Sequence, residues 1–189
     1  MKIAICVPTH NEPADRINLV MARINEAVGP GHVISRFNDA GSRGKGFALR
    51  EAVKAVDADV YIFIDGDGDI DPIQIKDIVY YLMHGYDVVV GAKQLPHRAG
   101  RKILTYLSRM WVFMLFGITV DTQIGLKGFR YKPDWYLDGW AFDIEILYKA
   151  KKDKKKMIQI PVRAVVSSGK KWHDIASTLR DTIKLRFGL

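Results

Sequence analysis

Four carboxylates occupy alternate positions of the segment DGDGDID, from Asp65 to Asp71, directly after the apolar run Val60–Ile64. Carboxylates this close repel one another when no counter-charge is present. A hard divalent cation such as Mg²⁺ or Mn²⁺ takes oxygen ligands and would relieve that repulsion. Gly66 and Gly68 leave room for a ligand to approach the backbone. The segment therefore predicts a metal site that holds a phosphorylated ligand.

Two other interpretations of this segment compete with a metal site. A calcium loop of the EF-hand type needs Gly at its sixth position and Glu at its twelfth, where this chain has Ile70 and Lys76, so that interpretation is excluded. A solvated turn rich in Asp and Gly remains as the alternative. The apolar run before the cluster favours the metal site, because ligands of parallel sheets bind beyond the carboxyl ends of the strands.

The elements that must position this cluster alternate between strand-like and helix-like patterns. Four apolar runs predict strands in the first half of the chain: Lys2–Val7, His32–Phe37, Val60–Ile64 and Asp87–Val90. Amphipathic segments between them predict helices, so we expect an α/β fold with a mostly parallel central sheet and helices on both faces. The second half is less regular. It adds a short strand at Gly125–Arg130 and a strand from Met157 to Val166, which Pro161 places at an edge or a bulge.

Length and charge bound the function further. The 189 residues predict one domain, 1–189, and the single cysteine excludes an intrachain disulfide. The net charge is +8, and residues 150–189 contribute all of it, with eight Lys and three Arg against three Asp. An amphipathic helix at about 172–187 closes this basic segment, flanked by Arg180, Lys184 and Arg186. Such a segment indicates an anionic partner: phosphate, nucleic acid or a lipid surface.

Five sequence blocks occur in a characteristic order. They are VPTHNE (Val7–Glu12), GSRGKGFAL (Gly41–Leu49), DGDGDIDP, DTQIGLKGFR (Asp121–Arg130) and WAFDIEILY (Trp140–Tyr148). Together they resemble the family 2 glycosyltransferases of the GT-A fold. The likeness is nearest to the dolichyl- or polyprenyl-phosphate sugar synthases, with the glucosyl branch first and the mannosyl branch next. It covers nearly the whole chain.

This resemblance implies a donor site. Asp65 and Asp67 match the DxD pair, which would bind a Mg²⁺ or Mn²⁺ that bridges the nucleotide diphosphate, and Asp69 would be a third metal contact. His10 stands where relatives carry Tyr and keeps a flat ring for stacking. Besides Asp65, the residues expected to bind the nucleotide or its phosphates are Pro8, His10, Glu12, Arg43, Lys45, Gly66 and Lys93.

The resemblance also implies an acceptor side. Gln123 and Gly125 match a loop that faces the sugar and the acceptor, while Asp121 and Asp143 are candidates to position or deprotonate the acceptor. A structural role is open for both acids, since Asp143 also lies near a helix start, where a carboxylate is favourable. Further cations that could hold an acceptor phosphate are Arg98, Arg101, Arg109 and Lys170.

One departure from the family pattern concerns the base-binding half. Relatives have a strand that ends in an acidic segment, followed by a helix, before the Gly-rich loop. This chain passes through one strand, His32–Phe37, directly to that loop and retains only Asn38–Asp39. We therefore expect a GT-A fold shortened by about one strand–helix unit, and the identity of the base stays open.

The resemblance implies an inverting transfer of a hexose from UDP-glucose or GDP-mannose to an acceptor, with a polyprenyl or dolichyl phosphate expected first. A lipid phosphate is already anionic and needs positioning more than a base, whereas a protein or glycan hydroxyl, the alternative acceptor, would need one. A nucleotidyltransferase fits less well, because no Gly-rich, basic loop follows the first strand. A nucleic-acid-binding module is the remote alternative, and no helix-turn-helix, zinc or RNA-binding signature supports it.

Membrane contact is the remaining question. The longest uncharged apolar run, Met110–Val120, has eleven residues, and a bilayer span needs about 20. We expect a cytoplasmic protein that is either soluble or peripheral on the membrane face. The aromatic segment Leu104–Phe116 and the closing helix would lie in a lipid interface in the second case. In the alternative they pack into the core or against a second copy, and no oligomeric state is predicted.

Overall fold

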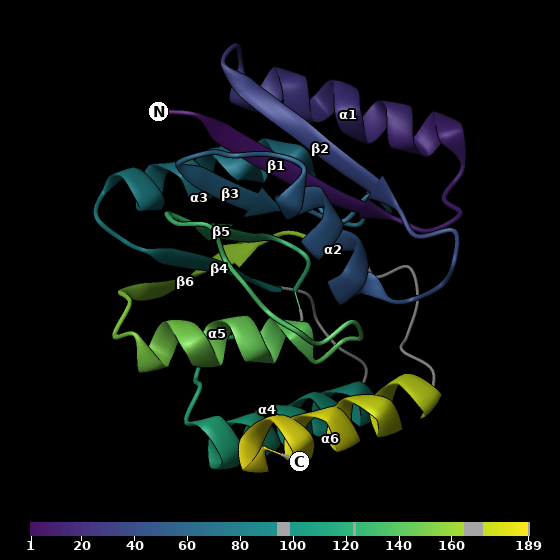
Figure 1. Ribbon diagram of the computed structural model, residues 1–189, viewed down its shortest axis with the longest axis vertical. Helices are drawn as coiled ribbons and strands as arrows, with labels where there is room; N and C mark the ends of the chain where they lie inside the picture. Colours follow the sequence, from purple (N-terminus) through teal and green to yellow (C-terminus); the bar gives the residue numbers. More distant parts are fainter. Residues whose placement is uncertain (94–98, 123, 165–171, 189) are drawn as a thin grey trace.

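A six-stranded sheet forms the centre of the molecule, in the order β2-β1-β3-β5-β4-β6 (Figure 1). The structure, a computed structural model, describes residues 1–93, 99–122, 124–164 and 172–188, apart from the side chains of 93, 99–104 and 172–175. The strands are β1 (Ile3–Thr9), β2 (His32–Asn38), β3 (Val60–Phe63), β4 (Val88–Lys93), β5 (Lys127–Phe129) and β6 (Met157–Val162). Neighbouring strands run parallel except β5, which is antiparallel to β3 and β4. The predicted mostly parallel sheet is confirmed.

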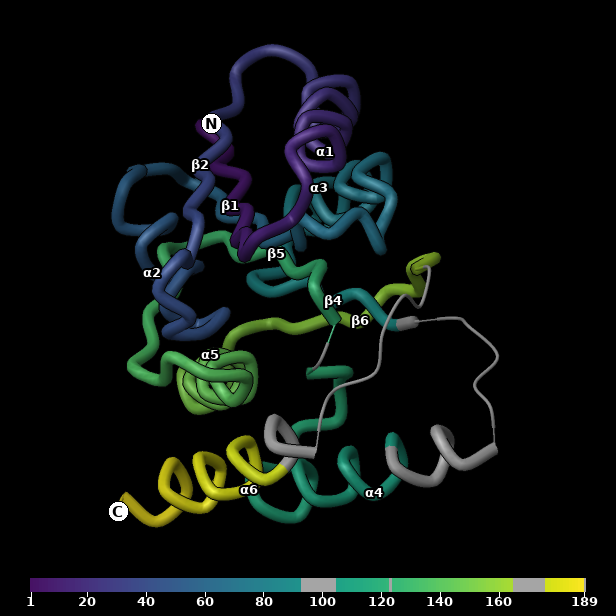
Figure 2. Tube along the Cα trace, turned by 90° about the vertical axis from the view of Figure 1, so that its right-hand side faces the viewer, coloured from purple at the N-terminus to yellow at the C-terminus, as the bar shows by residue number. Residues whose placement is uncertain are grey.

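Helices cover both faces of this sheet, as the alternating pattern predicts. They are α1 (Ala14–Val28), α2 (Lys45–Lys54), η1 (Pro72–Gln74), α3 (Ile75–Met83), α4 (Ala99–Phe116), α5 (Phe142–Lys152) and α6 (Trp172–Phe187). Figure 2 shows α1 and α3 on one side of the sheet and α2 and α5 on the other. Helices α4 and α6 lie side by side beyond α5, where the Trp111 indole donates a hydrogen bond of 3.0 Å to the Thr182 hydroxyl.

The core explains why the strands hold their places. All four residues of β3 are buried, and so are six of the seven residues of β1. Helix α1 turns Ile17, Val20 and Ile24 inward at helical spacing. Each such aliphatic side chain contributes about 1.5–3 kcal/mol when it leaves water. The tip of β3 is therefore a fixed platform, and Asp65 follows it by two residues.

The short strand β5 has a direction that periodicity does not reveal. It lies between β3 and β4, antiparallel to both, and pairs Phe63 with Lys127. The same antiparallel register, continued by two residues, sets Gly125 beside Asp65. The loop that precedes β5 is thereby brought to the carboxyl end of β3.

The two edges of the sheet agree with the sequence. Strand β2 pairs only with β1 in the sheet and leads directly into the loop before α2, so one strand stands between α1 and that loop. Strand β6 is the other edge and tolerates Pro161, which cannot donate to a second neighbour. Residues 165 and 166 of the predicted last strand lie outside the described part of the chain.

Candidate active site

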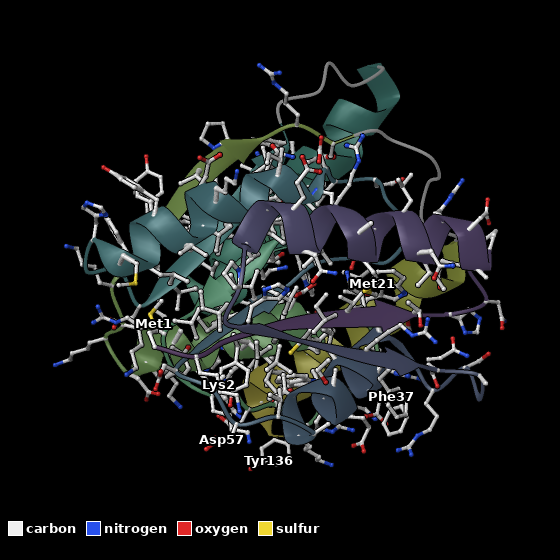
Figure 3. All side chains as sticks on the ribbon, turned by 90° about the horizontal axis from the view of Figure 1, so that it is seen from above. Met1, Lys2, Met21, Phe37, Asp57 and Tyr136 are labelled. Carbon is white, nitrogen blue, oxygen red and sulfur yellow. The ribbon has the colours of Figure 1, made fainter. Side chains whose placement is uncertain are left out.

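Loops that follow three parallel strands meet at one edge of the sheet. Strands β1, β2 and β3 all point toward this edge, because they pair in parallel. Figure 3 shows Phe37, near the end of β2, at the opposite side of the molecule from Met1 and Lys2, which precede β1. The segments that follow these strands contain His10, Asp39 and Asp65. This edge is where ligands of α/β sheets bind.

Lys45 and Asp65 form the centre of this edge. The Lys45 ammonium, at the start of α2, lies 2.6 Å from Asp65 Oδ1, and its side chain is 13% exposed. Burial opposes the charged ammonium, but the carboxylates of Asp65, Asp143 and Asp67 outweigh it and raise the pKa of Lys45 above its ordinary value. Lys45 is therefore a fixed positive charge among the acids, beside the Trp140 ring at 5.6 Å.

The remaining acids of the cluster differ in their surroundings. Burial, together with the negative charge of Asp65, raises the pKa of Asp67 above its ordinary value. The backbone N–H of Asp69 donates 3.0 Å to Asp67 Oδ1, which closes a tight turn. Asp71 faces away from this group: it accepts from Arg23 at 3.0 Å and from the N–H of Ile73 at 3.1 Å, so it caps η1. Its role is structural.

The chemistry of the donor set fits a divalent cation. Asp65 is close enough for its charge to disfavour ionisation of Asp67, and a cation between the two carboxylates would remove that cost. Among the described residues, no three His, Cys, Asp or Glu side chains converge on one point. Mg²⁺ in proteins is commonly held by one or two carboxylates, with substrate phosphates and water completing the shell. The Asp65–Asp67 pair fits that arrangement, and the third metal contact expected of Asp69 stays a prediction.

Two glycines form close contacts around Asp65. A Cβ at position 125 would lie 2.1 Å from Asp65 Oδ2, so this carboxylate packs directly against the backbone of Gly125. A Cβ on Gly66 would lie 2.7 Å from Thr9 Cγ2 and 3.1 Å from the Pro8 carbonyl oxygen. Gly66 was expected to leave room for a ligand. The Cβ position of Gly66 faces the end of β1, and its expected role in ligand access stays a prediction.

The other expected nucleotide residues line the ends of β1 and β2. Pro8 is buried within β1, whereas His10 is exposed, and its Nδ1 lies 2.8 Å from the carbonyl oxygen of Asp39. Glu12 accepts a hydrogen bond from the backbone N–H of His10. The Asp39 carboxylate is buried and accepts from the N–H of Gly44 at 2.7 Å. Asp39 thus fastens the Gly-rich loop to β2 and orients the start of α2.

The two cations of the Gly-rich loop occupy different places. The Arg43 guanidinium stacks 3.6 Å above the centre of the Phe47 ring and lies 3.5 Å from Asp138. Lys45 contacts Asp65, as described above. Lys93 ends β4, but its side chain is outside the described part. The same is true of the side chains of Arg98, Arg101, Gln123 and Lys170.

A buried ion pair involves one of the acids expected near the acceptor, and it was not predicted from the sequence. Lys127 Nζ is 2.8 Å from Asp143 Oδ1, with side-chain exposures of 2% and 6%. The same ammonium donates to the Ile124 carbonyl. The sequence signal was a Lys inside the strand-like run IGLKGFR, because a buried charge requires a partner. Asp143, expected near the acceptor, is the partner.

Asp121 is also paired with a cation. Its carboxylate lies 2.9 Å from Arg109 of α4, and its backbone N–H donates 2.5 Å to the Gln159 side chain. Asp121 and Arg109 line a cavity of about 450 Å³ between α4 and the segment 118–122. Its apolar wall includes Phe113, Ile118 and Val120. Since Asp121 and Gly125 are four residues apart, their Cα atoms are separated by at most about 14 Å. The cavity therefore lies close to the carboxylate cluster.

The outer faces of α4 and α6 expose large apolar side chains. They are Tyr106, Leu107, Met110, Phe113 and Met114 from α4, and Leu179, Ile183 and Phe187 from α6. Met114 is 73% exposed and Phe187 is 65% exposed. Among the described residues, no helix is both long enough and apolar enough to cross a bilayer. One interpretation of the sequence expected such side chains to pack into the core. The structure leaves the ones named here exposed.

Comparisons with known proteins agree with this geometry. The family model "Glycosyl transferase family 2" matches residues 22–168. A dolichyl-phosphate beta-glucosyltransferase from Dictyostelium discoideum is 24% identical, with 77% of this chain and 51% of that protein covered. The chain thus spans about half the length of this curated relative.

Solved structures resemble the whole chain. Glucosyl-3-phosphoglycerate synthase from Mycobacterium tuberculosis, in complex with Mn²⁺, UDP and phosphoglyceric acid, matches with a TM-score of 0.75 and 18% identity, covering 97% of this chain and 76% of that one. The same enzyme with Mg²⁺ and UDP gives a TM-score of 0.76 and 16% identity, covering 100% and 80%. At these identities the likeness shows the fold.

Proposed function

Because the chain belongs to glycosyl transferase family 2 and has the GT-A fold, we propose that it transfers a hexose from a nucleoside-diphosphate sugar to a polyprenyl phosphate, with inversion at the anomeric carbon. UDP-glucose is the donor proposed first and GDP-mannose second. The curated relative is a glucosyltransferase, and the M. tuberculosis synthase was crystallised with UDP.

The donor side of this proposal is supported by the Lys45–Asp65–Asp67 group. Asp65 and Asp67 would hold a Mn²⁺ or Mg²⁺ ion, which supplies neutralisation of the charge that develops on the leaving diphosphate. Lys45 places a permanent positive charge beside them, at the start of a helix where phosphate is favoured. The exposed ring of His10 and the Glu12 carboxylate would flank the base and ribose.

The observation that carries the choice of acceptor is the pairing of both candidate bases. Asp121 is engaged by Arg109, and Asp143 is buried against Lys127. A hydroxyl acceptor needs a carboxylate within reach to take its proton. A phosphate acceptor is already ionised and needs none. The ion pairs therefore support a lipid phosphate over a protein or glycan hydroxyl.

The transfer step then involves no proton. An oxygen of the acceptor phosphate attacks the anomeric carbon from the face opposite the diphosphate, and a new carbon–oxygen bond forms. The bond from that carbon to the diphosphate oxygen breaks, and the nucleoside diphosphate leaves with the electron pair. The chain's part is to hold donor and acceptor in line. Lys45 would bind the diphosphate, and Arg109, half-exposed beside Asp121, is the proposed contact for the acceptor phosphate.

The apolar face of α4 and α6 supports a peripheral contact with the cytoplasmic face of a membrane. Its large side chains are aligned on two neighbouring helices, and the cavity beside Asp121 offers space for the first part of a lipid chain. Basic residues on the same helices, Arg109, Arg180, Lys184 and Arg186, suit anionic head groups.

A transfer assay tests the proposal. Purified protein, Mn²⁺ and either UDP-glucose or GDP-mannose are incubated with a polyprenyl phosphate, and the product is identified by mass spectrometry. We expect a polyprenyl-phosphate hexose with the parent protein and none with Asp67→Ala. Transfer to a water-soluble glycan or protein, with none to the polyprenyl phosphate, would instead support the hydroxyl acceptor.

A further inference from the structure

Lys127 is a charged residue in a place that packing alone does not explain. It begins β5, and its Cα is fixed on both sides, opposite Phe63 of β3 and Val90 of β4. Its side chain is 2% exposed. A buried ion pair is usually no more stable than apolar residues of the same volume. A chain that only had to fill this space would be served as well by Leu or Met.

The Lys127 ammonium links two separate segments of the chain, the start of α5 and the loop before β5. It pairs with Asp143 in the first turn of α5, at 2.8 Å, and donates to the carbonyl of Ile124 in the loop before β5. Ile124 and Leu126 are buried on either side of Gly125. The hydrogen bond to the Ile124 carbonyl therefore fixes the backbone next to Gly125, which lies against Asp65.

The charges continue from this pair into the donor site. Asp143 is the second carboxylate that stabilises charged Lys45, and Lys45 is bonded to Asp65. Lysines and aspartates thus alternate from Lys127 through Asp143 and Lys45 to Asp65. The network reaches Asp65 twice, through this series of charges and through the Gly125 backbone.

We propose that Lys127 is a positioning residue that fixes the Gly125 backbone and the Asp143 carboxylate, and through them the Lys45–Asp65 pair that receives metal and diphosphate. Lys127 itself touches neither ligand. The inference rests on the proposed donor site for its binding readout and on the proposed transfer for its activity readout, whereas amide exchange tests it independently of both. Residues that orient the ligands of a metal in this indirect way typically change metal affinity by about 10- to 100-fold when they are replaced.

The test separates positioning from stability with a double variant. Lys127→Met alone leaves Asp143 buried without a partner and is expected to unfold readily. Lys127→Met with Asp143→Leu removes both charges at similar volume, so its melting temperature should stay near that of the parent. Ile146→Val, a buried change in the same helix, is the control for a small loss of packing. Lys127→Arg keeps the positive charge and tests whether a different cation can still hold Asp143 and the Ile124 carbonyl.

Three measurements are made on each variant. They are the affinity for UDP with Mn²⁺ by calorimetry, amide hydrogen exchange of peptides covering 118–126, and the rate of hexose transfer. For the folded double variant we expect about 10-fold weaker UDP–Mn²⁺ binding, faster exchange in 118–126 and a matching loss of transfer. Lys127→Arg should recover part of all three, and Ile146→Val should match the parent.

Parent-like affinity and exchange in the double variant would show that the pair only fills space, and would overturn the proposal. If the double variant does not fold, Lys127→Arg decides: faster exchange in 118–126 together with weaker UDP–Mn²⁺ binding supports the proposal, and parent-like affinity despite faster exchange contradicts it. A parent protein that transfers no hexose to polyprenyl phosphate would refute the proposed function instead. Binding and exchange would still decide the role of Lys127.

Discussion

Gly125 supports the carboxylate of Asp65 directly: a Cβ at position 125 would lie 2.1 Å from Oδ2. The contact follows from the antiparallel pairing of β5 with β3, which sets these two residues opposite each other just beyond the strand ends. The segment after β3, which carries the proposed metal ligands, and the loop before β5 therefore pack against each other.

Gly125→Ala should disable the site while the rest of the sheet persists. The methyl group has to displace Asp65 or the loop backbone, since the overlap is with a charged side chain held by Lys45. We expect about 10-fold or greater loss of UDP–Mn²⁺ affinity, comparable to replacement of a residue that orients a metal ligand. Calorimetry measures it, and Gly85→Ala is a useful comparison, because a Cβ there meets no neighbour and only the positive φ of 90° is strained. Equal affinity in Gly125→Ala and the parent would contradict the contact.

Asp67 should make the metal-free protein less stable at neutral pH. Its pKa is raised in the folded state, by burial first and then by Asp65, so folding favours the protonated carboxyl. This favourable contribution to the free energy of folding is fully present below pH 3.8, the ordinary pKa of the group. It is lost as the pH rises through the raised pKa of the folded protein. At pH 7 the folded protein therefore carries the cost of an ionised Asp67.

Asp67→Asn should accordingly raise the melting temperature of the metal-free protein at pH 7, by roughly 2–4 °C for each kcal/mol gained. The gain should shrink as the pH falls toward 4. Added Mn²⁺ should stabilise the parent and have little effect on the variant. Thermal melts at several pH values, with and without Mn²⁺, check this. A variant that is less stable than the parent at pH 7 without metal would show that repulsion at this site is absent.

Lys45→Met should weaken diphosphate binding. The substitution removes a charge-assisted contact of about 1.5–3 kcal/mol, which corresponds to roughly 10- to 100-fold in affinity for UDP. It also frees Asp65 from its cation, so Mn²⁺ alone should bind no more weakly than to the parent. Titration with UDP and with Mn²⁺ separately distinguishes the two effects. Loss of Mn²⁺ binding with unchanged UDP binding would show that Lys45 orients the metal-binding carboxylates and does not bind the diphosphate.

Met114→Asp should reduce association with anionic liposomes. Met114 is 73% exposed on the outer face of α4, and a carboxylate there meets both apolar lipid and negative head groups. Met83→Asp is the matched control, since Met83 is 53% exposed on α3, on another part of the surface. In flotation with vesicles that contain phosphatidylglycerol, the Met83→Asp variant should float with the vesicles and the Met114→Asp variant should not. Equal loss in both variants would remove α4 as the contact surface.

Much of the fold was predictable because its pattern is local. The apolar runs that became β1, β2 and β3 are bounded by Pro, Gly or charged residues, and Pro161 indicated an edge strand that the structure confirms. The direction of β5 was not predictable, because a three-residue strand carries no periodicity that distinguishes parallel from antiparallel pairing. Its neighbours are far away in sequence.

The site was predictable in its residue types and less so in their contacts. The pairing of Lys45 with Asp65 joins residues from two elements, and periodicity gives no distance between them. Asp143 was identified as important without its partner, since the buried Lys127 reads as one more polar residue in a short strand. Gly66 was assigned to ligand access, and its close contact with Thr9 was not foreseen. Such errors arise because sequence shows which groups are present and tertiary packing decides what they touch.

A crystal structure with Mn²⁺ and UDP is the most direct test of the donor site, because anomalous scattering locates the manganese without ambiguity. We predict manganese bound by a carboxylate of Asp65 or Asp67 and by the diphosphate of UDP, with Lys45 Nζ within hydrogen-bond distance of a phosphate oxygen. Manganese and UDP bound elsewhere on the molecule, with Lys45 still paired to Asp65, would contradict the assignment of this edge of the sheet to sugar transfer.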